Sequence, residues 1–283
     1  MKNLFETRLF NRYVYITAFF LVVSLFLSWI FVSGLVEILF LDYGAYDLPQ
    51  RAASENRAEM LPIFLQQIMI WEMLVDSSMA YIIHFLPLFF IFPTIPFFYE
   101  KKSYFVFGRH RFKSLSKSLW RGIVQHSLVA AFINSATFIT FYAITGIFVT
   151  RESAWMTMYG SFLPQSFYQN YPFLFVVFMF LTIYFALAFV FAFISCSVLL
   201  WVDNPFYGIF GIVIAYYIYL NVGSYLDYIL NLRFDLFWLG DTVASFNTWR
   251  TTSEVFIPLI PLFLIGIVIA YFGVKKEERN VTI

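Results

Sequence analysis

The sequence predicts an all-α integral membrane protein with six transmembrane helices. Of its 283 residues, 61% are hydrophobic and only 12% are charged, whereas an ordinary soluble protein carries about 25% charged residues. Six stretches provide the roughly 20 mostly apolar residues that a helix needs to cross a bilayer. A water-soluble fold is excluded, because too few charged side chains are present to cover its surface.

The spans are predicted at residues 13–41, 79–98, 123–149, 171–202, 205–226 and 255–273, within one transmembrane domain over 1–283. The first is expected to be a mature span. Its apolar run is far longer than the roughly 7 to 15 residues of a signal-peptide core.

The distribution of Lys and Arg predicts the orientation. Thirteen lie in the N-terminal segment, the loop between the second and third spans, and the C-terminal tail, against five in the other connections. Cations near span ends are retained on the cytoplasmic side, so we expect both termini inside and a multi-pass protein of the plasma membrane. The net charge of +1 gives no bulk attraction for nucleic acid.

The connecting segments predict short helices at the outer surface. Residues 61–76 repeat apolar side chains at helical spacing, opposite Gln and acidic residues, as in an interfacial helix. Residues 227–254 mix aromatic and acidic side chains, which suits the headgroup zone or a shallow re-entrant element. The fourth and fifth spans are joined by a minimal turn in which Asp203 or Asn204 caps the next helix, so these spans should be antiparallel neighbours.

Residues 98–123 hold the main concentration of charge, with seven cations and one acid. Leu115, Leu119 and Ile123 share a face opposite Lys and Ser, which predicts an amphipathic helix at the inner surface, and Gly108 divides the segment into two short helices. Three interpretations remain open: retention of cations on the inside, binding of anionic lipid, and docking of a partner.

The chain resembles the permease subunits of ABC-2 type transporters over nearly all of its length. In that family an amphipathic N-terminal helix, here KNLFETRLFNRY, precedes six spans, and the loop after span two folds as a coupling helix that docks into an ATPase. The resemblance assigns seven residues to this ATPase-coupling surface: Glu100, Lys101, Lys102, Gly108, Arg109, Arg111 and Lys113.

The resemblance implies a non-catalytic permease of an exporter. Two permease copies, identical or related, would form the pathway, and separate ATPase subunits would bind ATP and Mg and drive it. The apolar composition suits a hydrophobic or amphipathic substrate such as a peptide, a lipid or a drug. Alternatives are an ATP-independent channel or carrier and, with less support, an intramembrane enzyme.

The chain lacks the signatures of catalysis. No Gly-Lys dipeptide is present, so it has no phosphate-binding loop for ATP. His84, His110 and His126 lie on separate elements and Cys196 is the single cysteine, so we expect no metal site and no cofactor in this chain.

Polar residues within the spans have two interpretations each. Asn134 and Thr137 share a face of the third span, where they either form interhelical hydrogen bonds or line a pathway or dimer seam. His84 in the second span is either a proton relay or a neutral side chain bonded to a neighbouring helix.

Overall fold

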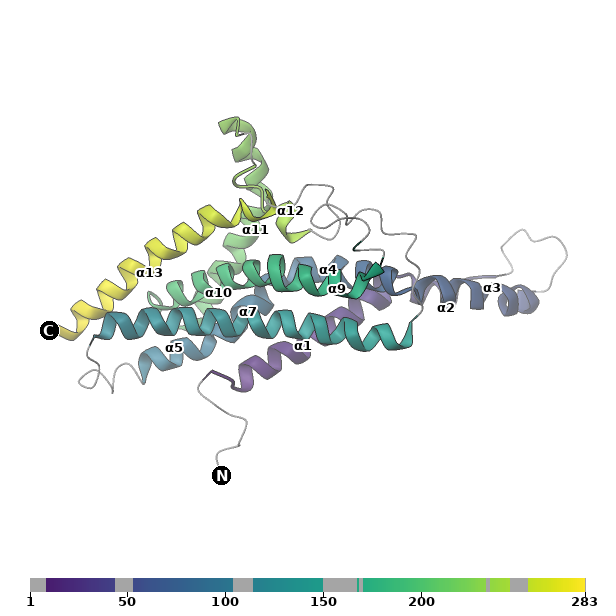
Figure 1. The fold of residues 1–283 in the computed structure, drawn as a ribbon, viewed down its shortest axis with the longest axis horizontal. Coiled ribbons are helices and arrows are strands. Elements are labelled where there is room, and N and C mark those ends of the chain that lie inside the picture. The colour runs from purple at the N-terminus through teal and green to yellow at the C-terminus, as the bar shows by residue number, and fades with distance from the viewer. Residues whose placement is uncertain are drawn as a thin grey trace, which may run out of the picture.

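The computed structural model describes residues 9–43, 53–103, 114–149, 167, 170–232, 235–244 and 254–282, and these residues form a helical protein (Figure 1). Six of its helical stretches are long and apolar enough to cross a membrane, which agrees with the predicted all-helical architecture of six spans and suggests a multi-pass membrane protein. These stretches are Arg12–Val32, Trp71–Lys102, Leu115–Phe148, Pro172–Leu199, Pro205–Leu230 and Glu254–Arg279.

The individual elements, in chain order, are α1 (Arg12–Val32), α2 (Leu35–Phe40), α3 (Ala53–Ile68), α4 (Trp71–Ile91), the 3-10 turn η1 (Phe92–Thr94), α5 (Ile95–Lys102), α7 (Leu115–Phe148), α9 (Pro172–Met179), the π-helical turn η4 (Phe180–Tyr184), α10 (Phe185–Leu199), α11 (Pro205–Leu230), α12 (Gly240–Val243), the 3-10 turn η5 (Glu254–Phe256) and α13 (Leu259–Thr282).

α10 is the central helix of the bundle, and it packs against α4, α7, α11 and α13. α1 lies against α4 and α7 at one side, while α2 and α3 project beyond the bundle at the end away from the C-terminal end of α13 (Figure 1). The core around α10 is largely aromatic. Phe138 and Phe180 stack with ring centroids 4.5 Å apart, and the Tyr142 hydroxyl lies 2.6 Å from the Ser78 hydroxyl.

The first two spans differ from their predicted bounds. The predicted helix over 13–41 ends at Val32, because Gly34 adopts a left-handed backbone with φ +75°, and the separate helix α2 follows. The predicted interfacial helix over 61–76 is divided at Ile70, whose backbone is extended. Its second half belongs to the second span, where Glu72 is 1% exposed, so an acidic residue taken as interfacial is in fact buried between helices.

The amphipathic segment before the third span also differs. Leu115–Ile123 forms the first turns of α7 and is continuous with the span, and the Ser114 hydroxyl caps it by accepting from the Lys117 N–H. Leu119 and Ile123 are buried against α5, α10 and α13, so their face is a core face. The predicted N-terminal amphipathic helix falls mostly on residues 1–8, which lie outside the described residues.

The connection between the fourth and fifth spans has the predicted helix cap. Asn204 caps α11 by accepting from the Phe206 N–H at 3.0 Å, and α11 contacts α10 before it turns away from the bundle (Figure 1). In the last connection α12 packs into the end of the bundle, where the Tyr184 hydroxyl donates to the Val243 carbonyl at 3.0 Å.

Gly223 determines how the chain after α11 folds back. A Cβ atom at this position would lie 2.2 Å from the Phe237 carbonyl oxygen, and one turn further along Asp227 accepts the Phe237 N–H with both carboxylate oxygens at 3.2 Å. We expect Gly223→Ala to destabilise the purified protein by about 2 kcal/mol, because the returning chain must move.

The matched control for this prediction is Gly211→Ala in the same helix, where no atom lies within 4 Å of the added Cβ. We expect that variant to melt at or slightly above the wild-type temperature, since Ala has the higher helix propensity by up to about 1 kcal/mol. Equal melting temperatures for the two variants would contradict the close approach at Gly223.

Candidate functional site: a broken helix and the groove beside it

The second span contains two buried prolines, Pro87 inside α4 and Pro93 in the 3-10 turn that follows it. Pro87 and Pro93 have no N–H to donate to the carbonyls four residues earlier, those of Ile83 and Phe89. Side chains of other helices bond to both carbonyls. The Tyr216 hydroxyl of α11 donates to Ile83 at 3.3 Å, and the Asn134 amide of α7 donates to Phe89 at 3.0 Å.

These contacts locate the two residues that were expected at a pathway or dimer seam. Asn134 is 1% exposed and also donates to the Ala130 carbonyl of its own helix at 2.8 Å. Thr137 is buried as well, and its hydroxyl donates to the Ile133 carbonyl at 2.7 Å. The geometry favours the interpretation that Asn134 makes an interhelical hydrogen bond, and it brings neither residue to an open surface of the chain.

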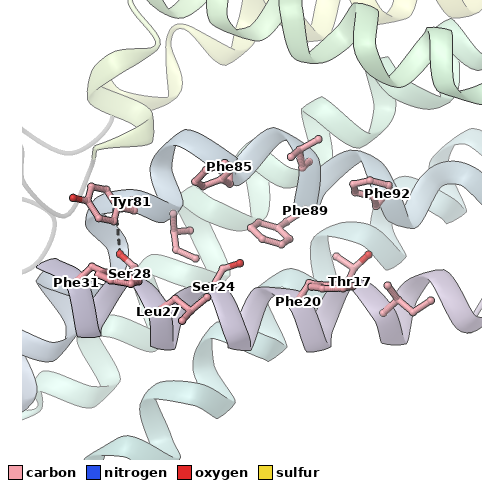
Figure 2. A pocket seen from close by; sticks show the side chains of 13 residues that line it. Thr17, Phe20, Ser24, Leu27, Ser28, Phe31, Tyr81, Phe85, Phe89 and Phe92 are labelled. Carbon is pink, nitrogen blue, oxygen red and sulfur yellow. Dashed lines mark hydrogen bonds between the residues drawn. The ribbon is translucent and has the colours of Figure 1, made fainter. Parts of the chain in front are cut away.

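A third contact enters α4 from α1. The Ser28 hydroxyl donates to the Ser77 carbonyl at 2.9 Å. It also accepts from the Tyr81 N–H at 3.1 Å (Figure 2). Residues 77 and 81 are one helical turn apart, so the Ser28 hydroxyl lies between the carbonyl and the N–H that bond to each other in a regular α-helix. Such an insertion is a recognised cause of helix bending. α4 is thus held at three places along its length by three different helices.

Next to these prolines, α1 and α4 line a groove of about 570 Å³ (Figure 2). Its lining is aromatic and aliphatic apart from three hydroxyl side chains, and it carries no charge. The residues are Ile16, Thr17, Phe20, Ser24, Leu27, Ser28 and Phe31 of α1 with Tyr81, Ile82, Phe85, Leu88 and Phe89 of α4 and Phe92 of η1. Such a site suits an apolar or amphipathic molecule with few polar groups.

His84 lies on the exposed side of α4, between positions Tyr81 and Leu88 that border the groove. Its backbone carbonyl accepts a hydrogen bond from the Tyr217 hydroxyl of α11. Ionisable side chains within a membrane span almost always face a protein interior or a water-filled cavity. His84 is thus an ionisable side chain on the exposed surface of a candidate span.

At the other end of the second span, the predicted coupling residues turn into the bundle. The Lys101 ammonium donates to the carbonyls of Leu199 at 3.1 Å and Leu200 at 2.8 Å, at the C-terminal end of α10, and lies 3.5 Å from the Glu277 carboxylate of α13. A cation is favourable here because the last carbonyls of a helix carry partial negative charge.

The two neighbours of Lys101 are also engaged inside the chain. A Glu100 carboxylate oxygen lies 3.3 Å from His126 Nε2, and His126 is 1% exposed. The Lys102 ammonium donates to the Asp203 carbonyl at 2.7 Å. The structure brings Glu100, Lys101 and Lys102 together as a brace between helices, whereas Gly108, Arg109, Arg111 and Lys113 lie outside the described residues.

We name the end of the bundle that carries this brace the basic end. It contains every Lys and Arg side chain that the structure describes except Arg57: Arg12, Lys101, Lys102, Lys117, Arg121, Lys275, Lys276 and Arg279. The start of α1 and the end of α13 lie at this same end, since Tyr13 stacks on Tyr99 and Glu277 faces Lys101.

Sequence reasoning missed Ser28 and Tyr216 as interhelical donors, whereas the polar cluster of the third span, to which Ser135 belongs, was expected to make such bonds. Ser135 donates to the Phe180 carbonyl at 2.8 Å, at the start of the π-helical turn η4. A usable signal was present for α4, because each proline marks a free carbonyl four residues before it. Within the described part of the chain, His, Cys, Asp and Glu side chains do not gather into a group of three or more that could hold a metal ion.

No family model, curated protein or solved structure matches the chain.

Proposed function

We propose that the chain is the transmembrane permease subunit of an ATP-driven exporter of the ABC-2 type, located in the plasma membrane. The observation that supports this proposal is the second span, which contains Pro87 inside α4 and Pro93 in the 3-10 turn after it and borders the apolar groove. Prolines that free backbone carbonyls within a span are found in transporters, where such helices border the substrate site.

The groove supports the proposed substrate class. It is open on the side of the bundle where α1 and α4 meet, and its hydroxyl groups from Thr17 and Ser24 give only weak polar contacts. A hydrophobic or amphipathic peptide, lipid or drug would enter such a groove from the bilayer without losing the solvation of a charge.

The pathway is proposed to form between two permease copies, identical or related. The exposed position of His84 within a span supports this, because a second copy would enclose the imidazole in a polar cavity. With the basic end on the cytoplasmic side, both termini lie inside.

ATPase subunits are proposed to dock on residues 104–113, which connect α5 to α7 in the sequence, and they would bind ATP and Mg. Glu100, Lys101 and Lys102 then act as the brace behind the docking segment. A displacement of that segment would be passed from α5 to α7 through His126 and to α10 and α13 through Lys101.

The proposal is tested by isolating the tagged full-length chain from its native membranes in mild detergent. We expect an ATPase subunit to co-purify and the complex to hydrolyse ATP, while the chain stripped of that subunit hydrolyses none. Hydrolysis by the pure single chain, or a native complex without any ATPase, would contradict the proposal.

A groove variant connects the test to the site. In the same complex, Ser24→Trp fills the groove and should reduce transport of a fluorescent amphiphile into inside-out vesicles by about tenfold, the cost of losing a well-packed contact of roughly 1.4 kcal/mol. Val22→Trp is the control, because Val22 lies on the same helix and is exposed but does not line the groove.

A further inference from the structure

A second concave site lies at the basic end, between the end of α10 and the last turns of α13. It has a volume of about 390 Å³ and is lined by Trp201, Phe272, Lys275, Lys276 and Arg279. Three of its five residues are cations, and neither Glu277 nor Glu278 lines it, although both are adjacent in sequence. The Glu277 carboxylate is instead 3.5 Å from Lys101, on the brace.

The site is built by a close approach of two segments. A Cβ atom on Gly273 would lie 2.9 Å from Trp201 Nε1 and 2.9 Å from a Leu200 methyl group, so the chain after α10 can meet α13 only because this residue has no side chain. The Trp201 ring is fixed by a hydrogen bond from its Nε1 to the Ile269 carbonyl at 3.1 Å. The Lys276 ammonium lies 5.1 Å from the centre of this ring, in cation–π geometry.

The surroundings of the site distinguish the kind of anion it would hold. Phe272 is 54% exposed, and Val268 and Ile265 continue the same exposed apolar face of α13 toward the middle of the span. Trp201 is at the end of a span, where aromatic side chains mark the headgroup level of a bilayer. A ligand with a charged head in the pocket and apolar chains along this face matches both features.

We infer that this pocket binds the phosphate headgroup of an anionic phospholipid, with its acyl chains along Phe272, Val268 and Ile265. Basic pockets between membrane helices recognise anionic headgroups because the cations meet the phosphate next to the bilayer surface. The inference does not depend on the proposed transport function, since it uses none of the residues of the groove.

The test uses the full-length chain in detergent, with bound lipid counted by native mass spectrometry. The probes are dioleoyl-phosphatidylglycerol and dioleoyl-phosphatidylcholine, which share their acyl chains and differ in net charge. We expect the anionic lipid to bind more tightly, and Lys275→Gln with Lys276→Gln to weaken it about thirtyfold, as expected for two cations at a bilayer surface.

Two further pairs of substitutions keep the outcome interpretable. Lys117→Gln with Arg121→Gln removes the same charge from exposed positions of α7 at the basic end, and should change binding less than about twofold if the pocket is specific. Lys275→Arg with Lys276→Arg keeps the charge and should retain binding, which separates a binding defect from a folding defect.

Equal losses for the α7 pair and the α13 pair would overturn the inference in favour of a general electrostatic attraction. Equal affinity for the two lipids would overturn it as well. Inorganic phosphate in excess should leave the lipid bound, because it gains nothing from the apolar face. Displacement of the lipid by inorganic phosphate alone would replace the lipid site with a free-anion site.

Discussion

Lys101→Glu is expected to lower the stability of the purified chain by roughly 3 to 5 kcal/mol, the range for breaking a buried charge pair. The substitution removes a cation from the carbonyls at the end of α10 and puts a carboxylate next to Glu277. Lys101 and Glu277 side chains are only 11% and 15% exposed, so solvent screens the new repulsion weakly. Thermal unfolding in detergent measures the effect, and Lys101→Met should give a smaller loss, about 1 to 3 kcal/mol.

Arg111→Ala is the comparison that separates the brace from the docking surface. We expect it to leave the melting temperature of the isolated chain unchanged and to weaken ATPase binding by about 1 to 3 kcal/mol, the value of a charge-assisted contact. If Lys101→Met instead leaves the melting temperature unchanged and loses ATPase binding, Lys101 contacts the partner and the brace is wrong. If Arg111→Ala alters neither quantity, the docking assignment of residues 104–113 fails.

The second large effect concerns labelling of the two ends of the bundle from outside intact cells. We expect one end to be labelled fully and the other not at all. Cys196 is fully buried, so the wild-type chain supplies a background that does not react with a maleimide. We expect Gln67→Cys on α3 to be labelled in intact cells by a membrane-impermeant maleimide, and Ser116→Cys at the start of α7 to be labelled only after the membrane is opened.

Denatured samples give the total reactivity once the labelling of Cys196 in denatured wild-type chain is subtracted. Labelling of Ser116→Cys but not of Gln67→Cys in intact cells would place the basic end outside and reverse the proposed orientation. It would also remove the ATPase-docking role of residues 104–113, because ATP is on the other side.

The number and type of spans could be predicted because an apolar run of sufficient length has few stable alternatives to a membrane helix. The start of the second span could not, since Glu72 and Asp76 look interfacial until the neighbouring helices that surround them are known. The same limit applies to Glu100, Lys101 and Lys102. Their charges predicted an outward surface, yet the carbonyls at the end of α10 satisfy a lysine well, and no pattern near residue 101 reveals that α10 ends beside it.

The candidate site, too, could be predicted from the sequence only in part. That Asn134 bonds another helix follows from the cost of a free amide in lipid, but its partner depends on Pro93, which lies on a different helix. The groove between α1 and α4 was not predictable, because it arises from the packing of two helices that are apolar on nearly every face.

The free carbonyls of the second span depend on donors that are synthesised at different times. Ser28 is synthesised before α4, but Asn134 follows the Phe89 carbonyl by 45 residues, and Tyr216 follows the Ile83 carbonyl by 133 residues. An unpaired carbonyl in hydrocarbon costs several kcal/mol. We therefore expect α4 to enter lipid less favourably on its own than after α7 and then α11 have arrived to donate to these two carbonyls.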